Sequence, residues 1–305
     1  ADEGATWTYV GGPSAVRRLV FHPLQPALAL AATSNGLWRS ADAGISWTRV
    51  TTETQIFDTA FAADGSAAYA TFLSHIWRSE DAGLTWQQFT GLTADFLDPI
   101  GLSADGAGLF TSARGTLFRY EPSAGEFVTV TTNLATGYVL RLAPSPTYAA
   151  DQTLLASTYD GVWISKDRGA TFTLSDGFFT LPVYTLAATT NDVNGGDFFA
   201  AGEYGVWRRR GGAWLPTNTG LFGGSAAYVS DMAVSPAYAA DGTLFTTQAS
   251  SVSVGTALFK STDRAATWRY VKSAGYISQI ELSPDFPTDP RAFMVADQRV
   301  LTSTD

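Results

Sequence analysis

The chain has 305 residues, 45% of them hydrophobic and 13% aromatic, which suffices to bury a large core. Its formal charge of −9 argues against nucleic acid as a partner, because binding to phosphates requires a basic face. The absence of cysteine excludes disulfides and thiolate metal sites. No run of about 18 apolar residues is present, so we expect no membrane span.

The sequence begins with Ala1 rather than Met, as an exported protein does after its signal peptide is removed. We therefore expect an exported protein, extracellular or in a bacterial cell envelope. Frequent glycine, threonine, valine and aromatic residues predict many short strands and turns. Without a helix-period segment or a linker-like stretch, residues 1–305 form a single predicted domain whose oligomeric state stays open.

An aromatic residue suited to open the last strand of a repeat recurs along the chain at intervals of about 40 to 54 residues. The positions are Trp7, Trp47, Trp86, Phe127, Phe172, Trp214 and Trp268. Seven units at this spacing account for the whole length. The predicted units cover residues 15–50, 55–90, 96–130, 138–174, 183–216, 228–271, and 276–305 together with 1–10.

Four units share the turn motif S-x-D-x-G-x-x-W just before this aromatic. Ser and Asp side chains hydrogen-bond the backbone of tight turns, Gly takes the positive φ that closes them, and the aromatic packs inward. The motif residues are Ser40, Asp42, Gly44 and Trp47; Ser79, Asp81, Gly83 and Trp86; Ser165, Asp167, Gly169 and Phe172; and Ser261, Asp263 and Trp268. The third and fifth units depart from the motif, the fifth carrying Arg208–Arg210, which we interpret as a solvated hairpin tip.

The two ends of the chain hold complementary parts of one further motif. Residues 299–305 match the strand and the opening of the motif, and residues 2–10 match its remainder. A closed ring, in which the N-terminal strand completes the last unit, requires this arrangement and leaves no free sheet edge.

The predicted inner strands carry a polar row and a row of small residues on one face. The polar row comprises Arg18, Asp58, Pro99, Arg141, Thr185, Asp231 and Gln279. Two positions after each member of the polar row, on the same face of its strand, the residue is small, with Glu281 as the exception. These residues are Val20, Ala60, Gly101, Ala143, Ala187 and Ala233. Crowding around a central axis favours small residues. We expect the polar row to ring one mouth of a central channel. We interpret it as an inter-unit network in which Arg18 meets Asp58; the alternative is a small polar ligand held at the axis.

Loops bordering the same face carry aromatic residues that are candidates for a docking surface: Phe96, Tyr159, Phe178, Phe179, Tyr204 and Phe222. The alternative is that they fold back over the strand ends. Ser-Pro segments at 145, 235 and 283 precede Asp151, Asp241 and Asp289, which we interpret as turn residues because one carboxylate per loop is too few for calcium.

The turn motif, together with the G-[VL]-[WF] segment before it, resembles the BNR/Asp-box β-propeller superfamily. This superfamily includes sialidases, xyloglucan-cleaving hydrolases, sortilin-type luminal domains and photosystem II assembly-factor propellers. The resemblance implies an all-β fold: a seven-bladed β-propeller of four-stranded antiparallel blades, its last blade closed by the N-terminal strand. It also implies that the motif residues are structural and lie away from the usual ligand face.

The signatures of the enzymes in that superfamily are missing. Residues 15–20 lack the R-I-P segment of sialidases, and xyloglucanases of this kind use two propellers. Asp58 and Asp231 belong to distant units, whereas glycoside hydrolysis needs two carboxyls facing across a cleft. His22 and His75 are isolated, so they form neither a triad nor a metal site. We therefore assign no catalytic residue, metal or other cofactor.

The favoured function is a non-catalytic, exported protein-binding or scaffold module, with a protein as partner. A carbohydrate-binding or sialidase-like hydrolase propeller is the first alternative, with a glycan as ligand. An assembly factor or accessory subunit of a membrane complex, such as a photosynthetic one, is the second; the arginine patch that marks those propellers has its only counterpart here in Arg208–Arg210.

Overall fold

The computed structural model describes most of the chain in detail. The described residues are 6–89, 92, 94, 97–103, 108–130, 134, 138–145, 147–175, 181–189, 197–210, 212–222, 228–249, 255–286 and 288–304. Phe96, Phe178 and Phe179, which the sequence places in docking loops, lie outside these residues, as does the side chain of Pro99.

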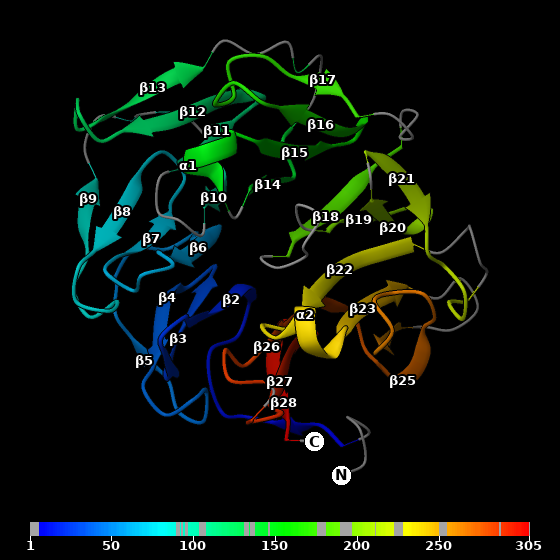
Figure 1. Ribbon diagram of the computed structural model, residues 1–305. Coiled ribbons are helices and arrows are strands. Elements are labelled where there is room, and N and C mark those ends of the chain that lie inside the picture. Colours follow the sequence, from blue (N-terminus) through cyan, green and yellow to red (C-terminus); the bar gives the residue numbers. More distant parts are fainter. Residues whose placement is uncertain are drawn as a thin grey trace.

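In the described part of the chain, seven antiparallel four-stranded sheets surround a central axis (Figure 1). Blade one contains β2 (Val16–His22), β3 (Gln25–Thr33), β4 (Gly36–Ser40) and β5 (Thr48–Arg49). Blade two contains β6 (Asp58–Phe61), β7 (Ala68–Thr71), β8 (Ile76–Ser79) and β9 (Gln87–Phe89). Blade three contains β10 (Leu97–Leu102), β11 (Leu109–Ala113), β12 (Thr116–Glu121) and β13 (Glu126–Val130).

Blade four contains β14 (Arg141–Pro144), β15 (Leu154–Thr158), β16 (Gly161–Ser165) and β17 (Thr173–Leu174). Blade five contains β18 (Val183–Ala188), β19 (Phe198–Gly202), β20 (Gly205–Arg210) and β21 (Ala213–Pro216). Blade six contains β22 (Tyr228–Val234), β23 (Leu244–Ala249), β24 (Thr256–Ser261) and β25 (Arg269–Ala274). Blade seven contains β26 (Ile277–Leu282), β27 (Ala292–Ala296), β28 (Arg299–Ser303) and β1 (Thr8–Tyr9). The first strand of each blade lies nearest the axis (Figure 1).

The N-terminal strand closes the ring, which confirms the prediction from the split motif. β1 pairs antiparallel with β28, with Thr8 opposite Thr302 and Tyr9 opposite Leu301. Trp7 is buried in one apolar cluster with residues of blades six and seven. Closure covers the edge that β28 would otherwise expose.

The core lies between neighbouring blades. The second strands β11, β15, β19 and β27 are buried along their entire length, because each is covered on both faces by adjacent blades. Phe293 of β27, for example, packs with Leu19, Ala29 and Ala31 of blade one. Seven such interfaces give the ring its rigidity.

Two of the Ser-Pro segments form one-turn helices, where the sequence predicts plain turns. These are α1 (Tyr148–Asp151) and α2 (Tyr238–Asp241). Asp151 accepts hydrogen bonds from Ser145 Oγ at 2.6 Å and from the Thr153 amide at 2.9 Å, and Asp241 does the same in its own turn. The buried tyrosine of each helical turn packs edge-on against a phenylalanine of the preceding blade, which favours the helical turn over an open one.

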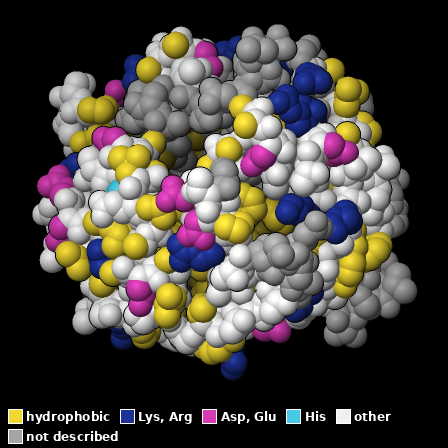
Figure 2. Space-filling view, turned by 60° about the horizontal axis from the view of Figure 1, so that its bottom comes forward, with side chains coloured by type: hydrophobic (Ala, Val, Ile, Leu, Met, Phe, Trp, Pro, Cys, Tyr) yellow, Lys and Arg dark blue, Asp and Glu magenta, His cyan; other side chains and the backbone are white. Residues whose placement is uncertain are grey.

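Charged side chains of both signs are interspersed over the surface seen in Figure 2, and hydrophobic side chains gather there only in small groups. Within the described ranges, no helix is both long and apolar enough to cross a membrane. Those same ranges contain no cluster of three His, Cys, Asp or Glu side chains suited to bind a metal ion.

Candidate functional site

A bulge at the start of the inner strands creates the main cavity of the molecule. In β2 the pairing with β3 shifts between Val16 and Arg18, and equivalent shifts occur in β10, β18, β22 and β26. Each shift leaves one extra residue, such as Arg17 in β2 and Tyr184 in β18. A bulge re-aims a side chain out of the ladder, and here Arg17, Tyr184, Ser230 and Ser278 line the opening of the central channel.

This opening, which we call the axial mouth, is a cavity of about 690 Å³ lined by residues from all seven blades. Five tyrosines line it: Tyr138, Tyr159, Tyr184, Tyr228 and Tyr276. Three arginines, Arg17, Arg114 and Arg141, and the serines 112, 230 and 278 line it too. Among the described lining residues there is no Asp or Glu. The described arginine, tyrosine and serine side chains of this lining all carry hydrogen-bond donors.

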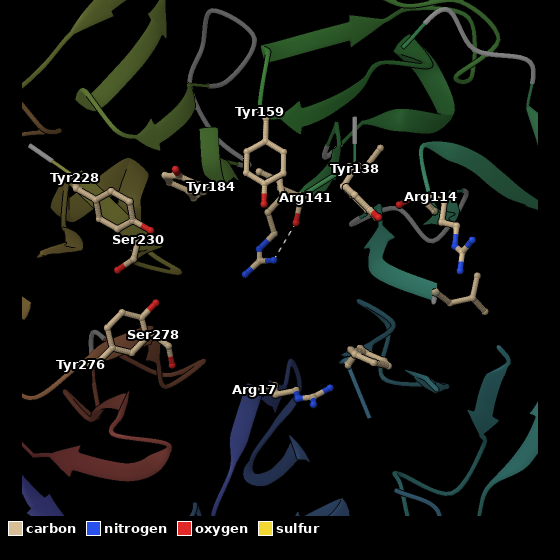
Figure 3. A pocket seen from close by; sticks show the side chains of 15 residues that line it. Arg17, Arg114, Tyr138, Arg141, Tyr159, Tyr184, Tyr228, Ser230, Tyr276 and Ser278 are labelled. Atoms are coloured by element: carbon tan, nitrogen blue, oxygen red, sulfur yellow. Dashed lines mark hydrogen bonds between the residues drawn. The ribbon is translucent and has the colours of Figure 1, made fainter. Parts of the chain in front are cut away.

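Figure 3 shows how these side chains surround an open space. Tyr184, Tyr228 and Tyr276 lie on one side of it, and Tyr138 and Arg114 lie on the opposite side. The Arg141 side chain projects from blade four toward the centre, and its Nη1 donates to the Leu140 carbonyl at 3.0 Å. The cavity thus has a largely aromatic wall and a largely cationic one.

The cationic wall is held by neighbouring groups. The Arg17 guanidinium lies 4.6 Å from the centroid of the Phe57 ring, and its Nη2 donates to Gln55 Oε1 at 2.7 Å. Arg114 occupies the turn between β11 and β12 with a positive φ of 47°. Both contacts on Arg17 fix its position, and neither of these two partners is anionic.

The tyrosines of the aromatic wall stay protonated. Burial raises the pKa of Tyr184, and the hydrogen bond that its hydroxyl donates to Glu203 Oε1 at 3.1 Å raises it further. Burial also raises the pKa of Tyr228, whose ring centroid lies 5.0 Å from that of Tyr184. Both hydroxyls therefore stay neutral at physiological pH, and that of Tyr184 donates its proton to Glu203.

The predicted polar row lies on the channel wall below the mouth. Arg18, Asp58, Arg141, Thr185 and Asp231 line a smaller chamber of about 110 Å³ there. Arg18 Nε lies 3.6 Å from Asp58 Oδ1. Gln279 of the same row exchanges two hydrogen bonds of 2.7 Å with the backbone of Leu19 in the next blade.

Glu281 extends into the same chamber, at the one position of its row that is not small. Gln279 Nε2 donates to its Oε2 at 3.2 Å. Burial raises the pKa of Glu281 to about 7; Arg18 opposes this shift and the Asp231 carboxylate adds to it.

The S-x-D turns lie at the opposite end of the blades from the mouth. The mouth lies where the first strand of each blade begins, and the antiparallel third strand runs away from that end and finishes at the S-x-D turn. In the first turn, Ser40 Oγ donates to Asp42 Oδ1 and accepts from the Gly44 amide, both at 2.8 Å. The turns at Asp81, Asp167 and Asp263 repeat this pattern. In the fourth, Ala265 takes the glycine position with a positive φ of 65°.

The docking candidates within the described residues are all exposed, in different surroundings. Tyr159 lines the axial mouth. Tyr204 is exposed in the turn between β19 and β20, and its carbonyl accepts from Asn218 Nδ2 at 3.2 Å. Phe222 is exposed on one side and packs on Phe259 and Tyr270 with its ring centroid 4.9 and 5.7 Å from theirs.

Arg208 does not lie at a solvated hairpin tip, contrary to the interpretation from sequence. It lies within β20, forms an ion pair with the buried Asp197, and donates from Nη1 to the Arg264 carbonyl at 3.1 Å. Tyr238 Oη donates to the same Asp197 carboxylate at 2.9 Å. Arg208 therefore joins blades five and six.

The sequence analysis did not identify most residues of the mouth, although the sequence contains one pattern that indicates some of them. Extending the aligned inner strands by a single residue upstream places Phe96, Tyr138, Tyr228 and Tyr276 in one column. Three of these four aromatic residues line the mouth. The bulged residues, by contrast, leave no trace in the sequence pattern, since a bulge depends on strand pairing.

Fold and site together define a seven-bladed β-propeller with an arginine- and tyrosine-lined axial mouth. No protein-family model matches the sequence, and no curated protein matches it. Among solved structures, the GH74 xyloglucanase from Xanthomonas campestris is similar, with 17% identity and a TM-score of 0.75; the match covers 98% of this chain and 53% of that chain. This chain thus spans about half the length of that enzyme.

Two further propellers are similar. YCF48 bound to D1 peptide has 14% identity and a TM-score of 0.68, with 97% of this chain and 93% of that chain covered. The extracellular domain of a one component system from B. thetaiotaomicron has 14% identity and a TM-score of 0.69, with 98% and 39% covered. At these identities the likeness establishes the fold, and the site has to be interpreted from its own residues.

Proposed function

We propose that this protein is a non-catalytic, exported binding module that holds an acidic segment of a partner protein in its axial mouth. The observation that carries the proposal is the lining of the mouth. Three arginines, five tyrosines and three serines line one cavity, and no carboxylate is found among its described lining residues. Such a surface complements a ligand rich in hydrogen-bond acceptors and negative charge.

The contrast with the rest of the molecule strengthens this assignment. The chain as a whole carries a formal charge of −9. A group of arginines in an otherwise acidic protein concentrates positive potential at one place, where it attracts anions and orients them. Arg17 and Arg141 both face the interior of the mouth, so an anionic group that enters along the axis meets them together.

The size of the mouth suits a short segment. Its volume of about 690 Å³ lies within the range of pockets that bind small ligands or a few residues of a peptide. The tyrosine rings provide apolar contact area with little loss of side-chain entropy on binding, as aromatic anchors do at protein interfaces.

A binding role rather than hydrolysis is supported by the state of two of the three axial carboxylates within the described residues, Asp58 and Asp231. Asp58 accepts from the backbone amides of Thr59 and Ile100 at 2.8 and 2.9 Å. Asp231 accepts from the Ile280 amide and Thr185 Oγ1 at 3.0 and 3.1 Å. Carboxylates engaged in this way hold blades together and are poorly placed to act as acid and base on a substrate.

YCF48 bound to D1 peptide provides an analogy: a propeller of similar length that binds a peptide. By that analogy, a role as an assembly factor for a membrane complex is one form of the proposed function. Fractionation of cells that express the full-length protein tests the exported location.

The second candidate function is recognition of a glycan. The faces of Tyr138, Tyr159 and Tyr276 are suited to stack on sugar rings, and the X. campestris enzyme of the same fold is a xyloglucanase. This candidate predicts binding that depends on the tyrosines and tolerates loss of the arginines.

Isothermal titration separates the two candidates. We expect a capped peptide of alternating Asp and Glu to bind wild-type protein, and its Asn/Gln counterpart to bind at least tenfold more weakly, because charge-assisted hydrogen bonds contribute about 1.5–3 kcal/mol each. R17Q/R141Q should remove this preference, and R210Q, at an exposed position on β20, should retain it. Equal binding of both peptides, or equal loss in R210Q, would contradict the proposal. Binding of xyloglucan oligosaccharides that is lost in Y159A would favour the glycan candidate.

A further inference from the structure

We propose that the Glu281 carboxylate, which lies on the axis beneath the mouth, competes with ligand anions for the arginines there and so determines how tightly the mouth binds acidic segments. The identity of the ligand rests on the function proposed above. The competition itself rests on the arrangement of charges along the channel.

Glu281 is the one long side chain in a row of small ones. Its counterparts in the other blades are Val20, Ala60, Gly101, Ala143, Ala187 and Ala233. Glu281 lines the chamber of about 110 Å³ beneath the mouth, whereas none of these small residues is among the described residues that line it. The carboxylate therefore lies where the channel narrows below the mouth.

Arg141 and Arg18 connect the chamber with the space above it. Arg141 lines the axial mouth, the narrower space beneath it and the chamber. Arg18 lines the last two of these, beside Asp58. The same guanidinium groups thus face a ligand on one side and Glu281 on the other.

The other charged groups around Glu281 come from several strands. β2 contributes Arg18, β6 contributes Asp58, β14 contributes Arg141 and β22 contributes Asp231; Thr185 of β18 and Gln279 of β26 itself add neutral polar groups. Asp58 and Asp231 each accept two hydrogen bonds from backbone or hydroxyl donors, which fixes them in the blade interfaces.

With Arg17 included, the described residues that line the two lower spaces of the channel comprise three arginines and three carboxylates when Glu281 is ionised. Neutral Glu281 leaves one positive charge in excess. Burial raises the pKa of Glu281 to about 7, so this charge changes between pH 8 and pH 6, where arginines stay charged and tyrosines stay neutral. Affinity for an anion should therefore rise as the pH falls across this range.

The test compares wild type with E281Q, which is permanently neutral. The probes are the capped Asp/Glu peptide and inorganic sulfate, both fully ionised at pH 6 and pH 8. E126Q, which removes an exposed charge from β13, is the matched control. Wild type and E126Q should bind each probe about five- to tenfold more tightly at pH 6 than at pH 8. A change of this size is usual for the coupling free energy between two sites. E281Q should bind at both pH values as wild type does at pH 6.

The outcomes distinguish the two proposals. If sulfate binding shows the expected dependence and the peptide does not bind, the proposed function is wrong and the competition stands. If E281Q keeps the pH dependence of wild type, the competition is wrong. The two histidines, His22 and His75, are present in both proteins, so any difference between the proteins comes from Glu281. A folding defect in E281Q would appear as a lower unfolding temperature without ligand, and E281A then provides the second neutral variant.

Discussion

The carboxylate of Asp231 accepts a hydrogen bond of 3.0 Å from the backbone amide of Ile280 in the following blade. Its other oxygen accepts from Thr185 Oγ1 of the preceding blade at 3.1 Å. One buried side chain of blade six thus joins blades five and seven close to the axis. Asp58 joins blade two to blade three in a similar way, through the Ile100 amide.

Substitution D231A should destabilise the protein by about 2–4 kcal/mol, because it leaves two buried donors without an acceptor and each costs about 1–3 kcal/mol. D231N, which keeps one carbonyl oxygen, should cost less. Guanidinium unfolding monitored by tryptophan fluorescence measures both. The control is D64A on an exposed turn. A D231A variant as stable as wild type would contradict the inter-blade role.

The S-x-D turns should make stability depend on pH in the acid range. Although burial raises the pKa of Asp81, hydrogen bonds from Thr85, Ser79 and the Leu84 amide outweigh it and lower the pKa to about 2. A folded-state pKa below the unfolded value gives stability that is present above the unfolded value near 4 and is lost as the pH falls toward 2. D81N should therefore be less stable than wild type at pH 7, by about 1–2 kcal/mol.

The difference between D81N and wild type should shrink when unfolding is measured at pH 2, where the wild-type contribution is being lost. S79A removes the hydroxyl that donates to Asp81 Oδ1 at 2.7 Å. This variant should therefore lose less stability than wild type between pH 7 and pH 2. A constant difference from pH 7 to pH 2 would show that the charge of Asp81 contributes nothing.

Ring closure predicts that T8C/T302C forms an intramolecular disulfide. The two residues are direct partners in the β1–β28 ladder, and Cα atoms of such antiparallel partners lie within the range that a disulfide spans. The chain has no cysteine of its own, so no competing thiol is present. Oxidation should raise the unfolding temperature and reduction should reverse the gain, as measured by calorimetry. Failure to cross-link, with T8C alone as control, would contradict closure through β1.

Gly220 should tolerate substitution far less well than Gly125. Both have positive φ, 97° and 69° respectively, so alanine is strained at both. At Gly220 a Cβ atom would also lie 2.0 Å from the Trp268 carbonyl oxygen, whereas at Gly125 no atom lies within 4 Å. G220A should thus lose several kcal/mol against about 1 kcal/mol for G125A. Similar losses of stability in both variants would show that the backbone hydrogen bond from the Trp268 amide to the Thr219 carbonyl can shift.

The sequence predicted the parts of this molecule that depend on local chemistry. The S-x-D turns repeat because each needs the same Ser, Asp and positive-φ residue, and the split motif at residues 299–305 and 2–10 predicted ring closure. The polar row on the inner strands was also visible, because strand periodicity places Arg18 and Asp58 at equivalent positions.

The axial mouth could not be predicted in the same way. Arg17 and Tyr184 reach it because their strands bulge, and the bulge depends on how the second strand pairs. Arg114 and Tyr159 reach it from turns between second and third strands, which strand alignment does not cover. Arg208 was misassigned for a related reason: its partner Asp197 lies just before the neighbouring strand β19, outside the repeated motif.

Oxidative footprinting of tyrosines tests most directly whether the axial mouth is the ligand face. Tyr138, Tyr159 and Tyr276 in the mouth are 62%, 49% and 57% exposed; Tyr9 and Tyr270 on the outer strands are similarly exposed, at 48% and 46%. With the acidic peptide bound, mass spectrometry should show the three mouth tyrosines protected and the two outer ones unchanged. Protection of Tyr9 or Tyr270, with the mouth still reactive, would contradict the account.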